Sequence, residues 1–301
     1  MKPKYFKQVN LLIDILSILS NYPDMALHGG SAINFFLDNM PRLSVDIDLT
    51  YVHFSDRNQA LQSIAINLKQ IRLSIIDSFG NVRVEMPKIE NDEYKLYCSR
   101  GGSTVKLEVN TINRGILGDV QVLQISQNAQ NIFEKFCEAR IVSNQQLFGG
   151  KIVAALDRQH PRDIFDVKKI LDKINLADIK DGILLLLLSS KRPLHELLQP
   201  NPLDMEKTFE NQFEGMTNEM FSYDDYLAVR ENLILSVNEI INEVDKQFLT
   251  DFFDGNPDWN IYDFENYPAI KWKLKNVKKL KINNPPKHNF HQKLLKKALK
   301  V

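Results

Sequence analysis

The chain has 301 residues, of which 44% are hydrophobic and 25% are charged, an ordinary composition for a globular protein. This length suits one large domain or two modest ones, and it is enough to bury a core without disulfides. The two cysteines, Cys98 and Cys137, fit no metal or redox spacing, which excludes a disulfide framework and favours a reducing, cytoplasmic location.

The formal net charge is zero, because 38 basic residues balance 38 acidic ones, but the charges are unevenly distributed. Between Lys271 and Val301 there are eleven lysines and no acidic residue, whereas the stretch 204–265 is rich in Asp and Glu. The basic tail is expected to attract RNA first, and otherwise the acidic stretch of the same chain or a membrane surface. No segment has the length and apolarity of a transmembrane helix.

Apolar spacing predicts the elements in chain order. Helical spacing over 5–22, interrupted by polar residues, predicts an amphipathic helix rather than a signal peptide. The patterns that follow predict helices over 32–39 and 58–71 and strands over 45–52, 73–76, 81–86, 94–98 and 104–111. After about residue 130 the pattern turns helical, with helices over 144–158, 162–174, 178–188 and much of 204–252. We therefore expect an α+β fold with a mixed N-terminal half and a helical C-terminal half.

A glycine pair, Gly29-Gly30, stands where the short apolar run 26–28 passes into the helix expected over 32–39. Glycine lets the backbone come close to a ligand, and the N–H groups at the start of a helix suit phosphate. Ser31 follows directly and can add a hydroxyl donor. This junction is therefore a candidate phosphate-binding turn.

Two aspartates, Asp46 and Asp48, lie two residues apart on the strand expected over 45–52. Residues two apart on a strand share one face, so both carboxylates project together, with Ser44 beside them and Arg42 at the entry to the strand. Ser44 and Arg42 are candidate nucleotide- or phosphate-binding residues. Two adjacent carboxylates repel each other unless a cation neutralises them, and Mg²⁺ prefers such oxygen ligands. The alternative is a solvated strand face, but the glycine pair upstream favours a metal site beside a phosphate cradle.

These two motifs together resemble the signature of the DNA polymerase β-type nucleotidyltransferases. More narrowly, they resemble the AbiEii/AbiGii toxin family, which includes the MenT-like toxins. The residues that carry the resemblance are Gly29-Gly30-Ser31-Ala32 and Arg42-Leu43-Ser44-Val45-Asp46-Ile47-Asp48-Leu49. The resemblance implies a polymerase β-type domain with a mixed β-sheet flanked by helices, which uses NTP and two Mg²⁺ ions.

A third metal-facing carboxylate usually comes from a neighbouring strand in this superfamily, and Glu108 is the matching candidate. Apolar and polar residues alternate around it, so Lys106, Glu108 and Asn110 share one strand face. The alternative is that Glu108 forms a cross-strand ion pair with a lysine on the surface.

A lysine and two aspartates follow on the two helices expected after residue 144. On the first helix, Lys151 and Arg158 share one face, and on the second, Asp163 and Asp166 lie one turn apart. A lysine can hold a triphosphate as a point charge, and an aspartate can orient it; the alternative is a salt-bridge cluster at a helix start. The AbiEii-like toxins show a lysine followed by Arg-Asp-x-x-Asp, as at 162–166. Their essential late aspartate corresponds to Asp163 or Asp166, of which the first is expected to pair with a basic side chain.

The resemblance spans residues 26 to about 171, and it implies a cytoplasmic toxin. We expect a nucleotidyltransferase domain over 1–175 and a mostly helical C-terminal domain with a lysine-rich tail over 176–301. The toxin would transfer NMP to RNA, with the tRNA 3′ end as the expected acceptor, and so inhibit translation and growth in phage defence. A cognate antitoxin would be its partner, and no membrane would be. The alternatives are a small-molecule (antibiotic) acceptor, a protein acceptor, or a catalytically silent binding module.

Overall fold

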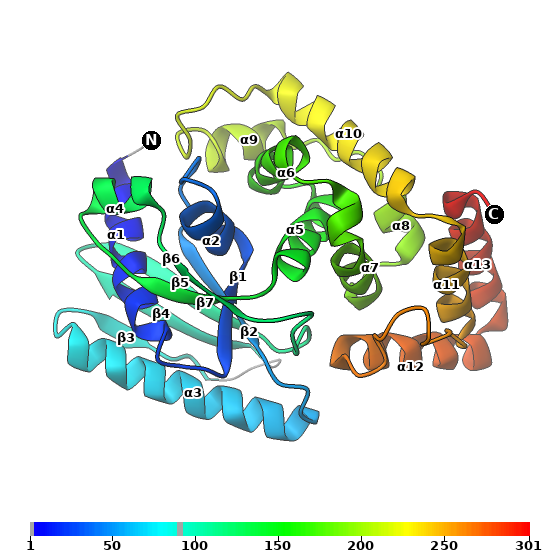
Figure 1. Ribbon diagram of the computed structural model, residues 1–301, viewed down its shortest axis with the longest axis horizontal. Helices are drawn as coiled ribbons and strands as arrows, with labels where there is room; N and C mark the ends of the chain where they lie inside the picture. The colour runs from blue at the N-terminus through cyan, green and yellow to red at the C-terminus, as the bar shows by residue number, and fades with distance from the viewer. Residues whose placement is uncertain (1–2, 89–92) are drawn as a thin grey trace. The chain divides into compact units, whose positions relative to one another are not determined.

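A computed structural model describes residues 3–88 and 93–301, which form two compact units (Figure 1). Unit 1 comprises the chain up to Ser143 together with the segment Phe213–Met220, and unit 2 comprises Asn144–Gln212 and Phe221–Val301. The boundary between the two packed units therefore lies after Ser143. The predicted boundary at residue 175 was instead placed after the last sequence motif. As a division of function, 1–175 and 176–301 stay a prediction.

Among the residues that the structure describes, unit 1 is built on a seven-stranded mixed sheet with the order β3-β4-β5-β2-β1-β7-β6. The strand β2 lies at its centre, antiparallel to β1 and parallel to β5. The strands are β1 (Met25–His28), β2 (Asp46–Tyr51), β3 (Arg83–Glu85), β4 (Tyr94–Arg100), β5 (Ser103–Asn110), β6 (Gln121–Gln124) and β7 (Glu138–Ile141). The mixed sheet flanked by helices confirms the predicted α+β class.

The helical segments of unit 1 flank this sheet and form a core with it. They are α1 (Pro3–Leu19), α2 (Gly29–Ala32) with its π-helical continuation η1 (Ile33–Leu37), α3 (Arg57–Ser78) and α4 (Gln127–Phe133). In Figure 1, α3 (cyan) runs beneath the sheet, and α1 and α3 contact each other and the strands. Because strand residues alternate between faces, Ile47 and Leu49 of β2 enter this core and leave Asp46 and Asp48 on the other face.

One predicted element of unit 1 is wrong, and the bounds of another differ from those predicted. The strand predicted over 73–76 is the last part of α3, because Ile64, Leu68, Ile71 and Ile75 form one buried helical stripe at spacings of four, three and four. A short apolar run alone does not separate strand from helix. The helix predicted over 32–39 begins earlier, at Gly29, and ends at Leu37.

The change from strands to helices was predicted at about residue 130, which is too early in the chain. Strand β7 pairs parallel with β1 and antiparallel with β6, which places it inside the sheet of unit 1. A strand of only four residues, with Ala139 and Ile141 facing the core, carries little pattern of its own.

Unit 2 is helical throughout its described elements. They are α5 (Asn144–Arg158), α6 (Pro161–Lys173), η2 (Leu176–Ile179), α7 (Lys180–Ser189), α8 (Leu194–Leu198), α9 (Glu206–Gln212), α10 (Tyr223–Ile240), α11 (Glu243–Asp254), α12 (Pro268–Asn283) and α13 (Pro285–Leu299). Helices α5 and α7 pack backbone against backbone, since a Cβ on Gly182 would lie 1.9 Å from the main-chain oxygen of Gln145. The predicted helices after residue 144 are thereby confirmed.

The lysine-rich tail forms the last two helices of unit 2. Helix α12 ends at Asn283, and α13 begins at Pro285, where the Asn284 side chain accepts from the backbone N–H of Lys287. Proline is favoured in the first turn of a helix, so the Pro285-Pro286 pair separates two helices and does not end the structure. Within the described part of the chain, no helix has the length and apolarity needed to cross a membrane.

Candidate active site

The paired carboxylates lie on the polar face of the central strand of unit 1. Asp46 and Asp48 are the first and third residues of β2, and both are half-buried. Ile47 between them is fully buried on the opposite face. The alternation predicted from the sequence therefore places two acidic side chains on one face of β2.

The glycine pair lies directly against this face. Gly29 has φ +73°, a conformation that other residues rarely adopt, and a Cβ there would lie 2.6 Å from Oδ2 of Asp48. At Gly30 a Cβ would lie 2.9 Å from Nη2 of Arg42 and 3.0 Å from Oγ of Ser44. A side chain at Gly29 would therefore be strained and would collide with Asp48, whereas one at Gly30 would require the Arg42 side chain to move.

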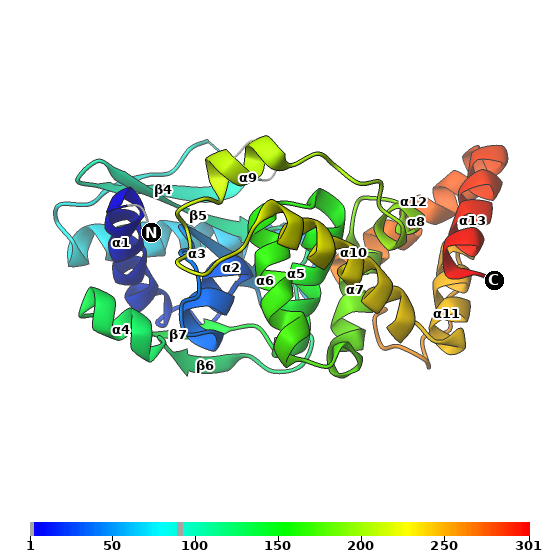
Figure 2. The ribbon, with the colours of Figure 1, turned by 90° about the horizontal axis from the view of Figure 1, so that it is seen from above.

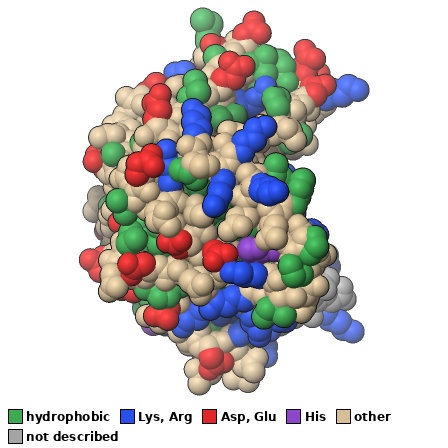
Figure 3. Space-filling view, turned by 90° about the vertical axis from the view of Figure 1, so that its right-hand side faces the viewer, with side chains coloured by type: hydrophobic (Ala, Val, Ile, Leu, Met, Phe, Trp, Pro, Cys, Tyr) green, Lys and Arg blue, Asp and Glu red, His purple; other side chains and the backbone are tan. Residues whose placement is uncertain are grey.

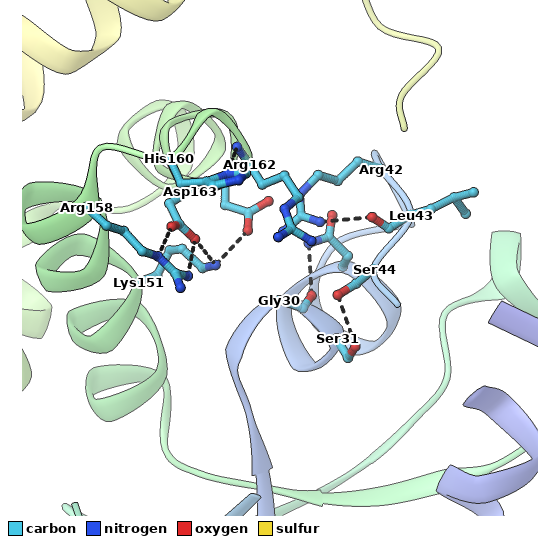
Figure 4. Close-up of polar contacts among 12 residues, drawn as sticks. Gly30, Ser31, Arg42, Leu43, Ser44, Lys151, Arg158, His160, Arg162 and Asp163 are labelled. Carbon is cyan, nitrogen blue, oxygen red and sulfur yellow. Dashed lines mark hydrogen bonds and ion pairs between the residues drawn. The ribbon is translucent and has the colours of Figure 1, made fainter. Parts of the chain in front are cut away.

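Ser31, Ser44 and Arg42 fix the entry to β2 (Figure 4). The Ser31 hydroxyl is buried and donates to the main-chain oxygen of Asp46, and its oxygen lies 3.1 Å from Oγ of Ser44. Arg42 is also buried, and its Nη1 donates to the main-chain oxygen of Leu43 at 2.9 Å. These contacts hold the strand in register, while the predicted phosphate contacts of all three residues stay predictions.

A segment far along the chain supports this entry, and the sequence analysis missed it. The backbone N–H of Leu43 donates to the oxygen of Met216 at 2.8 Å, and the Thr217 hydroxyl donates to the oxygen of Pro41 at 2.8 Å. Residues 213–220 thus belong to unit 1 although their neighbours in sequence belong to unit 2. No local pattern indicates a pairing across such a separation.

Glu108 lies where the resemblance places it, but it already has a partner. In the parallel register of β2 and β5, Asp48 is opposite Glu108 and Asp46 is opposite Lys106. Lys106 forms an ion pair with Glu108 along β5 itself and not across strands. Burial alone would lower the pKa of Lys106, but the bond to Glu108 and the charges of Glu108, Asp46 and Asp48 together raise it.

The donor set of this face fits magnesium held by two carboxylates. Within the described residues, no group of three or more His, Cys, Asp or Glu side chains is arranged to hold a metal, and Glu108 as a third metal ligand stays a prediction. Mg²⁺ typically takes one or two carboxylates and completes its shell with water and substrate phosphates. The charges of Asp46, Asp48 and Glu108 all act on Lys106, and Glu108 pairs with it, so Asp46 and Asp48 are the carboxylates that a divalent cation would bind on this face.

The other predicted charges form a compact, buried cluster in unit 2. Nζ of Lys151 lies 2.8 Å from Oδ1 of Asp163 and 3.0 Å from Oδ2 of Asp166, and all three side chains are at most 5% exposed. The guanidinium of Arg158 also donates to both carboxylate oxygens of Asp163 (Figure 4). The start of α6 is fixed by His160, whose Nδ1 accepts from the N–H of Arg162 at 3.1 Å. The predicted pairing of Asp163 with a basic side chain is confirmed.

This cluster is electrically balanced. Burial would raise the pKa of Asp163, but the charges and hydrogen bonds of Lys151 and Arg158 hold that pKa well below its usual range. Lys151 is shared by both aspartates, so the predicted contact between its ammonium and phosphate would compete with them. Which of Asp163 and Asp166 is essential stays open.

Comparison with known proteins identifies the family. A family model described as the AbiEii nucleotidyltransferase toxin of type IV toxin–antitoxin systems matches residues 10–276. The chain belongs to the AbiEii nucleotidyltransferase toxin family. Its structure is similar to that of MenT4, a nucleotidyltransferase toxin from Mycobacterium tuberculosis, with a TM-score of 0.62 over 92% of this chain and 95% of MenT4. Sequence identity is 13%, so this likeness concerns the fold. Proteins of curated function gave no match.

Membership of the AbiEii family confirms the predicted resemblance and extends it. The motifs carried the resemblance from residue 26 to about 171, whereas the family model reaches into α12. The chain is therefore a nucleotidyltransferase toxin of a toxin–antitoxin system, which implies a nucleotide substrate and an antitoxin partner.

Proposed function

We propose that this AbiEii toxin transfers NMP from an NTP to RNA, with the 3′ end of tRNA as acceptor, in a Mg²⁺-dependent reaction. The observation that carries the proposal is the pair Asp46 and Asp48 on one face of β2, pressed against a glycine pair at the start of a helix. Two neighbouring carboxylates on one strand face suit a divalent cation, and the glycine backbone beside them suits a triphosphate.

In this reaction a 3′ hydroxyl of RNA attacks the α-phosphorus of the NTP. The bond between that phosphorus and the β-phosphate oxygen breaks, and pyrophosphate leaves. Bound Mg²⁺, as two ions, would supply neutralisation of the triphosphate and of the entering and leaving oxygens. Asp46 and Asp48 would hold the metal, while Gly29 and Gly30 let the chain approach the phosphates without a side chain between.

The residues around β2 hold this strand in place. The Ser31 hydroxyl is bonded to the main chain of Asp46, and a Cβ at Gly29 would collide with the carboxylate of Asp48. Small displacements of reacting groups cost large factors in rate, so these contacts position the carboxylates for transfer.

The test is a label-transfer assay with purified protein, Mg²⁺, total cellular RNA and each α-³²P-NTP in turn. We expect label on RNA of tRNA size with the wild type, and none with Asp46→Ala/Asp48→Ala of unchanged far-UV circular dichroism. Absence of label on RNA with all four NTPs would overturn the RNA acceptor. Label on an added protein or small molecule instead would identify the alternative acceptor.

A further inference from the structure

The lysine-rich helices of unit 2 present a broad basic surface. Figures 1 and 2 show α12 and α13 adjacent to each other, and Figure 3 shows lysine and arginine side chains (blue) gathered on the end of unit 2 that these helices form. We define the lysine surface by its exposed members Lys271, Lys275, Lys278, Lys279, Lys287, Lys293, Lys296, Lys297 and Lys300.

Helical spacing arranges these lysines in rows. On α12, Lys271, Lys275 and Lys278 follow at steps of four and three. On α13, Lys293 and Lys297 lie four residues apart, and Lys300 follows just beyond the end of the helix. Residues at such steps lie on one face of a helix, about one turn apart. Each helix therefore presents a line of ammonium groups, which suits a polyanion with regularly spaced charges.

The acidic stretch of the same chain does not neutralise this surface. Lys281 pairs with Asp254 at 2.7 Å, and Nζ of Lys273 donates to the main-chain oxygens of Ser190 and Arg192 at 2.6 and 2.8 Å. Lys275, Lys278, Lys279, Lys287, Lys293, Lys296, Lys297 and Lys300 have no carboxylate within 4 Å among the described residues. The intramolecular pairing considered from the sequence is thus limited to one lysine of the tail.

The apolar side chains of the two helices favour RNA over a membrane. Ile270, Val277, Leu295 and Leu299 point into unit 2 and are at most 5% exposed, so neither helix offers the continuous apolar face that a membrane interface needs. Two separate aromatic rings, Trp272 and Phe290, are instead about half exposed among the lysines, at 50% and 59%. Lysines with interspersed aromatic rings are typical of surfaces that bind phosphates and stack on unpaired bases.

We infer that the lysine surface of α12 and α13 binds the phosphate backbone of the RNA acceptor and so holds the substrate by a region separate from Asp46 and Asp48. The inference rests on the proposed RNA acceptor. Binding through phosphates releases counterions, so it weakens steeply with salt and carries little sequence preference.

The experiment measures binding of fluorescein-labelled total tRNA to the full-length protein by anisotropy, without NTP, across a range of salt concentrations. Two variants remove three lysines each, by substitution with Gln. A matched control removes three exposed lysines elsewhere. The three sets are Lys275, Lys278 and Lys279; Lys293, Lys296 and Lys297; and the control set Lys7, Lys69 and Lys207.

Each variant of the lysine surface is expected to weaken tRNA binding at least tenfold at about 0.15 M salt and to reduce the slope of log K against log salt by about 3, one per phosphate contact. The control should change affinity less than about twofold, and substitution of the same lysines by Arg should restore binding. Unchanged tRNA binding in both surface variants, or an equal loss in the control, would overturn the inference.

Two further measurements separate this inference from the proposed function. Asp46→Ala/Asp48→Ala should lose label transfer but bind tRNA like the wild type. Salt-dependent tRNA binding through these lysines, with no transfer of any NTP to RNA, would defeat the proposed function alone. Capture of phosphatidylserine vesicles that the surface variants lose, with tRNA binding unaffected, would assign the surface to membranes and overturn the inference.

Discussion

Two clusters of acidic side chains in this protein are built from the same chemistry and differ in how their charge is balanced. In unit 1, Asp46 and Asp48 are half-buried on a strand, and Lys106 of the neighbouring strand forms an ion pair with Glu108. In unit 2, Asp163 and Asp166 are almost completely buried, and both contact Lys151. The first cluster is partly exposed to solvent, whereas the second is buried and contacts basic side chains of the protein itself.

From this difference we expect the cluster of unit 1, and not that of unit 2, to bind a metal cation. Burying a carboxylate costs several kcal/mol unless a partner compensates, and in unit 2 Lys151 and Arg158 are such partners. We therefore expect changes in unit 1 to affect activity more than stability, and changes in unit 2 to affect stability first.

Removal of the charges on β2 should give the largest effect. Asp46→Asn/Asp48→Asn is expected to lower label transfer by about 10²–10³-fold or more, because charge stabilisation of the reacting phosphate is lost. Its thermal midpoint should equal or exceed that of the wild type, since two repelling carboxylates are gone. A fall in the thermal midpoint that parallels the loss of activity would contradict a functional role for this pair.

Removal of the shared lysine should destabilise unit 2. Lys151→Met leaves Asp163 and Asp166 buried with less compensating charge, and loss of one partner from a buried ion pair costs about 3–5 kcal/mol. Urea unfolding measures the free energy directly. A variant as stable as the wild type, yet inactive, would show that Lys151 acts chiefly on substrate.

A methyl group at Gly29 should disturb activity more than folding. The Cβ of Gly29→Ala would lie 2.6 Å from Oδ2 of Asp48, and φ is +73°, so strain costs about 1–2 kcal/mol and the carboxylate must move. We expect label transfer to fall about tenfold to a hundredfold.

The matched control is Gly150→Ala, next to Lys151 on α5, where a Cβ has no neighbour within 4 Å. It should raise stability by about 0.5–1 kcal/mol, because alanine suits a helix interior better than glycine. Equal losses of activity in Gly29→Ala and Gly150→Ala would contradict the claim that close packing of Gly29 against Asp48 is needed for label transfer.

Acid should weaken unit 2 through Asp163. Because the folded-state pKa of Asp163 is depressed, the unfolded chain binds the proton more readily. The stabilisation is therefore complete above about pH 4 and is lost as the pH falls below that value. Unfolding free energies between about pH 3 and pH 6 should fall less steeply for Asp163→Asn than for the wild type, and identical slopes would contradict this assignment.

The sequence alone predicted the elements that have a clear period and the motifs that sit on them. The alternation around Asp46 and Asp48 placed both on one face of β2, and the helical spacing after residue 144 gave α5 to the residue. The pairing of Asp163 with a basic side chain also followed from the order of charges. Local pattern was sufficient here because each feature lies within one element or between two consecutive helices.

What the sequence did not predict depends on contacts between distant segments. Strand β7 is defined by its pairing with β1 and β6, and the segment around Met216 and Thr217 is defined by its bonds to the entry of β2. The ion pair of Lys106 with Glu108 was considered, but as a pair across strands rather than along β5. Such pairings are decided by packing, which leaves little local signal.

The most direct test of the account is metal binding at β2. Electron paramagnetic resonance of Mn²⁺, as a substitute for Mg²⁺, would be recorded with a non-hydrolysable NTP analogue for the wild type, Asp46→Asn/Asp48→Asn and Glu108→Gln. We expect the wild type to bind Mn²⁺ with the nucleotide, Glu108→Gln to retain most of this binding, and Asp46→Asn/Asp48→Asn to lose it. Equal Mn²⁺ binding by the wild type and Asp46→Asn/Asp48→Asn would contradict the claim that these two carboxylates hold the metal.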